Sequence, residues 1–594
     1  MDVLKQYYSL KDKHQRSFDE LNKRFHSVSL LRFVLVLAIL ICLYFLVFKT
    51  FTYLLFTLFI ALVLGFVLVL SYHSKIVFKR QFTKELIKIN QEEIDFLEKG
   101  EVPFKNGIEY LKPKHIYAFD LDIFGHKSLF QHLNRTATYI GEKILAGLLT
   151  KKATNEDILN NQNAIKELNE KLSWKQNLFA FAKLSKDEKN KYELLHSWLK
   201  SNNVALPKWV IIASYVLPFL FIGFGLAYFI SKENVFFNLF YQTFLLNVLV
   251  AFSQIKKMTK ELSFTTKIEE ITKAYSLIFE EIENENFESV KLIALKAKLN
   301  LNNQKASSAI KDLANIFSKL ASVQNVFGSI LLNGFFQYHI HIYRKLQTWK
   351  KENNTSVNNW LKVLGEFEAL NSLSNFSYNN PEYAFPEINT DKNLTFNNLG
   401  HPLLSKKERV DNDISFKNNR FVILTGSNMS GKSTFLRSLG VNMVLACCGS
   451  VVCASSAKVQ PMQLLVSMRL MDSLEENESY FFAEVKKLKL IMDLLEKDTS
   501  FVLLDEILRG TNSDDKRQGT IEVIKQMISK KAIGIIATHD LEVCNTTDEF
   551  PEILSNKCFE VEIVDNDLHF DFKLRKGVCK NKSASFLMKK MKVI

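Results

Sequence analysis

The chain has 594 residues, of which 47% are hydrophobic, and it carries a formal net charge of +14. Its length exceeds what one hydrophobic core supports and its composition excludes a disordered chain, so we expect about three or four structural units. The excess of Lys and Arg over Asp and Glu fits a nucleic-acid partner or an anionic membrane surface. We attribute much of this excess to the flanks of membrane helices, where Lys and Arg collect. Seven cysteines lack metal-ligand spacing, which indicates reduced thiols.

Four apolar segments are long enough to cross a bilayer. They form two pairs, each joined by a short polar link, which predicts two transmembrane hairpins. The flanks KIVFKRQFTK and KKMTKELSFTTK that follow the pairs are basic, so the positive-inside rule places all large soluble parts in the cytoplasm. We therefore expect an integral protein of the inner, cytoplasmic membrane. Its four transmembrane helices are predicted at about 30–48, 51–72, 209–230 and 235–255.

The same segments allow a second interpretation, as helices buried in a soluble core. The length and near absence of charge argue against it for the first pair. The second pair is less uniform, because Asn238, Gln242 and Asn247 interrupt its last segment. Such residues either hold membrane helices together through hydrogen bonds or line a transport path, and the sequence leaves both roles open.

The parts outside the hairpins are predicted to be helical up to about residue 390. Ile116–Leu206 has periodic apolar positions and a candidate N-cap at Thr154, and Met258–Ile388 contains long amphipathic runs. Pro381 and Pro386 then break the helical pattern and mark a linker. The predicted division is an N-terminal arm at 1–29, transmembrane hairpins at 30–72 and 207–256, a juxtamembrane helical linker at 73–115, helical regions at 116–206 and 257–390, and a C-terminal domain at 391–594.

The C-terminal domain has a different character from the rest of the chain. Short apolar runs of strand type, FVILTG, FVLLDE and IGIIATHD, alternate with helical segments, which predicts an α/β domain with a parallel sheet. Residues 426–433 match the phosphate-binding pattern G-x-x-x-x-G-K-[ST] between a strand and a helix. Such a loop holds phosphates with its backbone N–H groups and the helix N-terminus. We therefore predict a P-loop NTPase that binds ATP through Gly426, Ser427, Asn428, Met429, Ser430, Gly431, Lys432, Ser433 and Thr434.

The residues around this loop predict the chemistry of ATP hydrolysis. Lys432 is expected to reach the β- and γ-phosphates, and Ser433 to bind Mg²⁺. The strand FVLLDE ends in two carboxylates, of which Asp505 holds Mg²⁺ and Glu506 orients or deprotonates the attacking water. His539 follows the next strand and can sense the γ-phosphate. The candidate catalytic residues are therefore Lys432, Glu506 and His539, the metal ligands are Ser433 and Asp505, and the cofactors are ATP and Mg²⁺.

Three segments, TGSNMSGKST, LLDEILRGTNSDD and ATHD, together resemble the MutS family of DNA mismatch-repair ATPases. Asn428 and Met429 within the loop, and the run DE-I-x-R-G-T, are more specific than a P-loop alone. The helical region resembles the family's core and lever helices more weakly, and the resemblance as a whole spans roughly Phe119 to the C-terminus. The resemblance implies an ATPase domain of the ABC/MutS type, a homodimer with composite nucleotide sites, and DNA binding. It also implies that Ser479 contacts the nucleotide of the opposite subunit, although the residues flanking Ser479 depart from the family pattern.

Two features depart from the family as a whole. The stretch 73–115 is too short for the domain with which MutS proteins read mismatches, so that domain is expected to be missing. The second hairpin stands where the family inserts its DNA clamp, so we expect the clamp to be reduced or replaced. Two hypotheses follow. The first is a membrane-anchored MutS-like ATPase that couples ATP hydrolysis in a dimer to binding of mismatched or branched DNA. The second is an ATP-driven membrane-remodelling or transport machine with no DNA partner.

Overall fold

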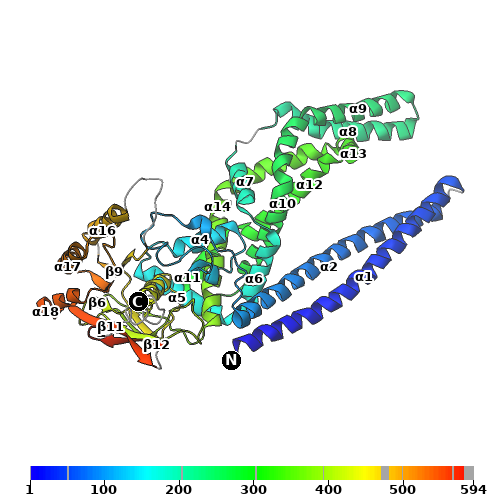
Figure 1. Ribbon diagram of the computed structural model, residues 1–594. Coiled ribbons are helices and arrows are strands. Elements are labelled where there is room, and N and C mark those ends of the chain that lie inside the picture. Colours follow the sequence, from blue (N-terminus) through cyan, green and yellow to red (C-terminus); the bar gives the residue numbers. More distant parts are fainter. Residues whose placement is uncertain are drawn as a thin grey trace.

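The computed structural model describes residues 2–49, 52–201, 205–301, 304–391, 393–469, 480–497, 499–564 and 567–580. A helical region is followed by an α/β domain, and two long helical hairpins extend from the helical region away from that domain (Figure 1). The predicted order, helices first and an α/β domain last, is confirmed.

The first hairpin consists of α1 (Val3–Phe48) and α2 (Tyr53–Lys99), which pack against each other as two uninterrupted helices (Figure 1). Each combines an apolar half at the hairpin tip with a charged half at its base. Residues 3–29 and 73–99 therefore continue the predicted spans as a helical stalk. Beyond α2, the predicted juxtamembrane linker contains only the short 3-10 helix η1 (Ile108–Tyr110).

The second hairpin and the helical body follow. Their elements are α3 (Leu129–Leu133), α4 (Tyr139–Leu148), α5 (Asn155–Glu170), α6 (Leu172–Ser185), α7 (Lys189–Lys200), α8 (Lys208–Ser231), α9 (Asn234–Ser253), α10 (Ile255–Asn284), α11 (Val290–Ala297), β1 (Asn300–Leu301), β2 (Gln304–Lys305), α12 (Ala306–Ala321), η2 (Ser322–Gln324), α13 (Val326–Phe336) and α14 (Tyr338–Asn379). Helices α8 and α9 form the second hairpin, which projects from the far end of the body (Figure 1).

Helices α1, α2, α8 and α9 are long and apolar enough to cross a membrane, judged by length and composition. The mean hydropathy of their most apolar windows ranges from 1.7 in α9 to 2.9 in α1 and α2. At most 17% of any of these windows is buried among the described residues. These helices therefore do not belong to the core of the chain itself, which argues against the interpretation as buried soluble helices.

Helix α14 contacts both hairpins. Near its start, Arg344 donates to the Tyr215 hydroxyl of α8 at 3.0 Å. At its end, Asn379 donates to the Glu93 carboxylate of α2 at 2.9 Å. Between these points α14 is buried against α4, α5 and α12. One long helix thus connects the bases of both apolar hairpins and leads into the α/β domain.

A six-stranded sheet forms the centre of the α/β domain. Its strands are β6 (Phe421–Thr425), β8 (Gln463–Ser467), β9 (Ser500–Asp505), β10 (Ile533–Thr538), β11 (Leu554–Val564) and β12 (Asp567–Lys576). They lie in the order β12-β11-β6-β10-β9-β8, and all pairs are parallel except β11 with β12. Strands β6, β9 and β10 are buried at every residue, as expected for parallel strands covered on both faces.

The predicted parallel sheet is confirmed for β11, β6, β10, β9 and β8, and two further features were not predicted. Strand β12 adds an antiparallel edge, and there is a second sheet of order β3-β7-β4-β5 whose β5 contacts β12. Strands β5 and β7 have only four residues each and alternate between buried and exposed positions, which is a weak signal in a sequence. The remaining elements are β3 (Glu387–Ile388), β4 (Thr395–Leu399), β5 (Asn412–Ser415), α15 (Lys432–Cys447), β7 (Ser456–Val459), α16 (Tyr480–Leu495), α17 (Ser513–Ser529), η3 (Leu541–Asn545) and α18 (Thr546–Glu549).

Candidate functional site

The phosphate-binding loop lies at the carboxyl edge of the six-stranded sheet, where β6 leads through residues 426–431 into α15. Gly431 has a φ of 100°, and a Cβ at this position would lie 3.1 Å from Cδ1 of Phe572. A Cβ on Gly426 would lie 3.0 Å from the carbonyl oxygen of Phe559. Both glycines are therefore required by close packing, and the loop ends at the N-terminus of α15, where helix N–H groups are unpaired.

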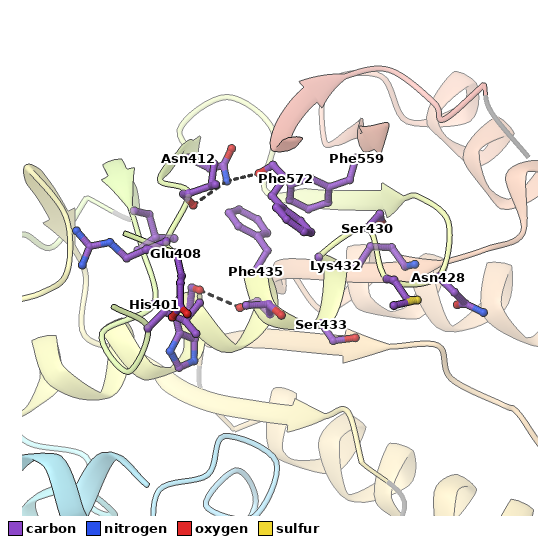
Figure 2. Close-up of a pocket in the computed structure, with 18 of the residues that line it drawn as sticks. His401, Glu408, Asn412, Asn428, Ser430, Lys432, Ser433, Phe435, Phe559 and Phe572 are labelled. Atoms are coloured by element: carbon purple, nitrogen blue, oxygen red, sulfur yellow. Dashed lines mark hydrogen bonds between the residues drawn. The ribbon is translucent and has the colours of Figure 1, made fainter. Parts of the chain in front are cut away.

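A cavity of about 330 Å³ opens beside this loop (Figure 2). Residues 428–434 line one side of it, and Glu506 lies in the same wall. The hydroxyl oxygens of Ser427 and Ser430 are buried and have no hydrogen-bond partner among the described residues. The size of the cavity is that of a site for a small ligand, and Ser430, Ser433 and Thr434 are the hydroxyl-bearing residues that line it.

Lys432 lies at the centre of the loop. Its Nζ donates to the carbonyl oxygens of Gly426 and Ser427 at 2.9 and 3.0 Å, and lies 3.4 Å from Nδ1 of His539. Burial lowers the pKa of Lys432, and the nearby charge of Glu506 opposes this change. The ammonium group is thus held against the loop that would carry the phosphates.

Ser433 and Asp505 are in contact, as the predicted metal site requires. The Ser433 hydroxyl donates to Oδ2 of Asp505 at 2.5 Å, whereas Oδ1 of Asp505 is buried without a hydrogen-bond partner in the described structure. Burial raises the pKa of the Asp505 carboxyl. Hydroxyl and carboxylate oxygens are the ligands that Mg²⁺ prefers, and a cation would pair with the unsatisfied oxygen, so this donor set fits Mg²⁺. Mg²⁺ usually keeps several water ligands and binds substrate phosphates, so two protein ligands suffice for such a site.

Glu506 and His539 are also in contact, through Oε1 of the glutamate and Nε2 of the imidazole. Nδ1 of His539 lies 2.9 Å from the carbonyl oxygen of Gly426, so the ring connects Glu506 to the phosphate-binding loop. The hydrogen bond from His539, together with the charge of Arg509, lowers the pKa of Glu506 to about 2. Glu506 has a φ of 49°, and its N–H donates to the carbonyl oxygen of Ala537 at 3.0 Å. This strained backbone position holds an ionised carboxylate at the cavity wall, where it can orient a water molecule by accepting a hydrogen bond.

The sequence did not identify the opposite wall of the cavity, which is partly aromatic (Figure 2). Phe572 of β12 lies against Gly431, with a φ of 53° and 40% of its surface exposed. Asn412 of β5 fixes this strand, because it donates to the carbonyl oxygen of Phe572 at 3.0 Å and accepts from the N–H of Leu574 at 2.7 Å. An exposed ring at this place is suited to stack on a nucleobase. No local motif marks Phe572, since the packing of β12 against β11 and β5 brings it to the loop.

Replacement of Phe572 by alanine is expected to weaken ATP binding by about tenfold, because one base–aromatic stack contributes about 1–3 kcal/mol. The dissociation constant can be measured by displacement of a fluorescent ATP analogue from the full-length protein in detergent. Leu541→Ala is the matched control, since Leu541 is an apolar residue of the same domain, 41% exposed and outside the cavity lining. Equal losses in the two variants would contradict base stacking on Phe572.

Ser479 lies outside the described residues, so its predicted contact with the opposite subunit remains a prediction. Helix α16, which follows it, is joined to the loop after β9, because Glu484 accepts the backbone N–H of Arg509 at 3.0 Å. Lys487 of the same helix donates to the carboxylate of Asp120 at 2.8 Å. The element that follows Ser479 is therefore joined both to the candidate active site and to the helical region.

The geometry places P-loop residues 428–434 and Glu506 around one cavity, and two comparisons relate this domain to known proteins. Residues 422–592 match the family model of MutS domain V. The chain is 33% identical over 214 residues to MutS protein homolog 4 of Homo sapiens, which covers 34% of this chain and 22% of that protein. It is 32% identical over 224 residues to the DNA mismatch repair protein MutS of Thermotoga petrophila, which covers 37% of this chain and 28% of that protein.

The similarity to MutS deduced from the motifs is thus confirmed for the domain that contains the candidate site. A MutS of Clostridium botulinum is 27% identical over 248 residues, covering 40% of this chain and 26% of that protein. The chain spans about a quarter of the length of these curated relatives. The match to the MutS domain V model begins at residue 422, so both hairpins and the helical region lie outside it.

Proposed function

We propose that this chain is a membrane-anchored, MutS-like ATPase that binds ATP with Mg²⁺ and hydrolyses it. The observation that carries the proposal is that P-loop residues 428–434 and Glu506 line one cavity, where Ser433 is hydrogen-bonded to Asp505 and Glu506 contacts His539. A P-loop alone supports binding of a nucleotide. An ionised carboxylate held beside it adds a group that can activate water.

Each group has a distinct role in this proposal. The P-loop N–H groups and Lys432 bind the β- and γ-phosphates, and Ser433 and Asp505 hold Mg²⁺, which neutralises phosphate charge when bound. Glu506 orients the attacking water and accepts its proton. His539 holds Glu506 by a hydrogen bond and contacts the loop through Gly426, so it is placed to respond to the γ-phosphate.

The proposal includes a homodimer with composite nucleotide sites, in which Ser479 of one subunit reaches the nucleotide of the other. It also includes anchoring by α1, α2, α8 and α9, with the soluble parts in the cytoplasm, where ATP is available. The long, weakly buried apolar windows of these helices support the anchor.

The energy of ATP hydrolysis has two candidate uses, DNA binding and movement of the membrane helices. The matched relatives include proteins named for DNA mismatch repair, and we propose mismatched or branched DNA as the partner of this chain. The second candidate is movement of the membrane helices without DNA. It is favoured by the chain path, because among the described residues between α7 and α10 the helices are α8 and α9 alone. By the resemblance drawn from the sequence, this is the position where the family inserts its DNA clamp. In this candidate α14 passes motion from the ATPase domain to the hairpins.

The test is made on full-length protein in lipid nanodiscs, by measuring ATP turnover and DNA binding over a series of salt concentrations. We expect Mg²⁺-dependent turnover that Lys432→Ala abolishes, and DNA affinity that falls steeply as salt rises, because phosphate contacts release counterions. Turnover without any DNA binding at low salt would reject DNA as the partner and leave the second candidate. Absence of turnover would reject the ATPase proposal itself.

A further inference from the structure

The short helix α13 exposes an apolar surface that neither the core nor the proposed ATPase explains. Its sequence, VFGSILLNGFF, has no charged residue. Four side chains remain largely uncovered: Phe327 is 84% exposed, Val326 62%, Phe336 56% and Leu331 53%. The helix lies at the far end of the helical body, beside the α8–α9 hairpin (Figure 1).

The polar side chains of α13 are turned inward and hydrogen-bonded. Ser329 and Asn333 are buried, and the Asn333 amide donates to the Ser329 hydroxyl at 3.1 Å and lies 2.8 Å from Nδ1 of His339. Asn325 caps the helix by accepting the N–H of Gly328 at 3.0 Å. A helix whose polar groups are satisfied by protein can enter hydrocarbon without unpaired donors or acceptors.

The C-terminal end of α13 packs at the middle of the hairpin. The Phe335 ring lies 5.4 Å from that of Phe221 and 5.7 Å from that of Phe244, measured between centroids. Phe221 and Phe244 stand near the midpoints of α8 and α9. Gly334 permits this approach, since a Cβ there would overlap the Phe244 ring. If the hairpin spans the bilayer, this end of α13 lies near the same depth as its centre.

Asn247, one of the polar residues in the fourth predicted span, connects the two elements. It is buried and donates to the carbonyl oxygen of Gly334 at 3.0 Å. Gln337, between α13 and α14, donates to both the backbone and side-chain oxygens of Asn247 at 2.9 Å. This use of Asn247 to join helices favours the first of the two roles that the sequence left open.

We infer that α13 is embedded in the hydrocarbon of the bilayer beside α8 and α9, as a half-length membrane helix. Its 11 residues extend about 16 Å, roughly half of the hydrocarbon thickness of about 30 Å. Acyl chains are the partner because the exposed side of α13 is apolar, uncharged and continuous with the exposed hairpin. The inference rests on the proposed membrane location of α8 and α9. Because α14 follows α13 directly, α14 would then begin inside the membrane, and a motion of α14 would move α13 within the bilayer.

The test places an environment-sensitive fluorophore on single introduced cysteines in full-length protein reconstituted into liposomes. Phe327→Cys reports on α13. Phe219→Cys, on α8 and 75% exposed, is the membrane reference, and Val290→Cys, on α11 and 74% exposed, is the aqueous reference. Labelling of the unsubstituted protein sets the background from the native cysteines, all of which are buried or half-buried. Quenching is measured with aqueous iodide and with lipids spin-labelled along their acyl chains.

We expect the probe at position 327 to match that at 219, with iodide quenching several-fold weaker than at 290 and strong quenching by the spin-labelled lipids. A probe at 327 that behaves like that at 290, while 219 is quenched by lipid, would overturn the inference and leave the proposed anchor intact. Iodide access at both 219 and 327 would instead reject the proposed anchor. Protection of 327 from both quenchers would indicate a protein contact, such as a second copy of the chain, and would also overturn the inference.

Discussion

Replacement of Glu506 by glutamine is expected to slow ATP hydrolysis by about 10²- to 10⁴-fold, the contribution of a general base, while ATP affinity stays nearly unchanged. The carboxylate contacts His539, not the phosphate-binding loop directly, so its loss should leave that loop in place. The measurement is the rate of phosphate release at saturating ATP, together with the dissociation constant for ATP.

The control for this variant is Glu522→Gln, an exposed glutamate on α17 of the same domain, which should turn over ATP at the wild-type rate. The pH profile provides a second check. Because the pKa of Glu506 is lowered to about 2, its carboxylate stays ionised as the pH falls toward that value, so Glu506 should not limit turnover between about pH 5 and 8. Wild-type turnover in Glu506→Gln would remove the residue from its proposed role.

Replacement of Glu93 by alanine is expected to lower the free energy of unfolding by about 3–5 kcal/mol, because it leaves a buried charge unpaired. Glu93 is buried and accepts from Nε and Nη2 of Arg135 at 2.6 and 3.1 Å. Asn375 and Asn379 of α14 donate to the same carboxylate at 3.0 and 2.9 Å. The variant should therefore also loosen the first hairpin from α14. Unfolding by denaturant in mild detergent, followed by tryptophan fluorescence, measures the loss.

Glu98→Ala is the matched control, since Glu98 is an exposed glutamate of the same helix that accepts a hydrogen bond from the exposed Tyr8 hydroxyl, and its loss should change stability by less than about 0.5 kcal/mol. Limited proteolysis of α2 offers a local readout, because a loosened stalk becomes accessible before the α/β domain unfolds. In the double variant Glu93→Ala with Arg135→Met the two losses should be less than additive. Additive losses would show that the pair is not coupled.

Much of the fold could be predicted because its signals are local. The four apolar segments are contiguous, and each structural helix that contains one has the length and composition to cross a bilayer. The strands β6, β9 and β10 are short unbroken apolar runs, which is the pattern of buried parallel strands. The second sheet and the antiparallel edge were missed, because strands such as β5 have four residues and acquire their identity from partners that are distant in sequence.

Most residues of the candidate site could also be predicted from local motifs, and one could not. Lys432 and Ser433 follow from the loop motif, and Asp505 and Glu506 from the end of an apolar strand, because parallel strands bring their carboxyl ends to one edge of a sheet. The contact between His539 and Glu506 follows from β10 lying beside β9. Phe572 could not be found in this way, since it reaches the cavity through the packing of β12 against β11 and β5.

Contiguous patterns were therefore sufficient for the two apolar hairpins, the P-loop and its carboxylates, because hydrophobic length and loop geometry depend on neighbours in the chain. Tertiary structure alone decided the aromatic wall of the cavity, the Glu93–Arg135 connection to α14 and the uncovered face of α13. In each of these cases the contacting residues come from separate elements. The free energy of their contacts comes from burial and pairing, which exist only after the elements pack together.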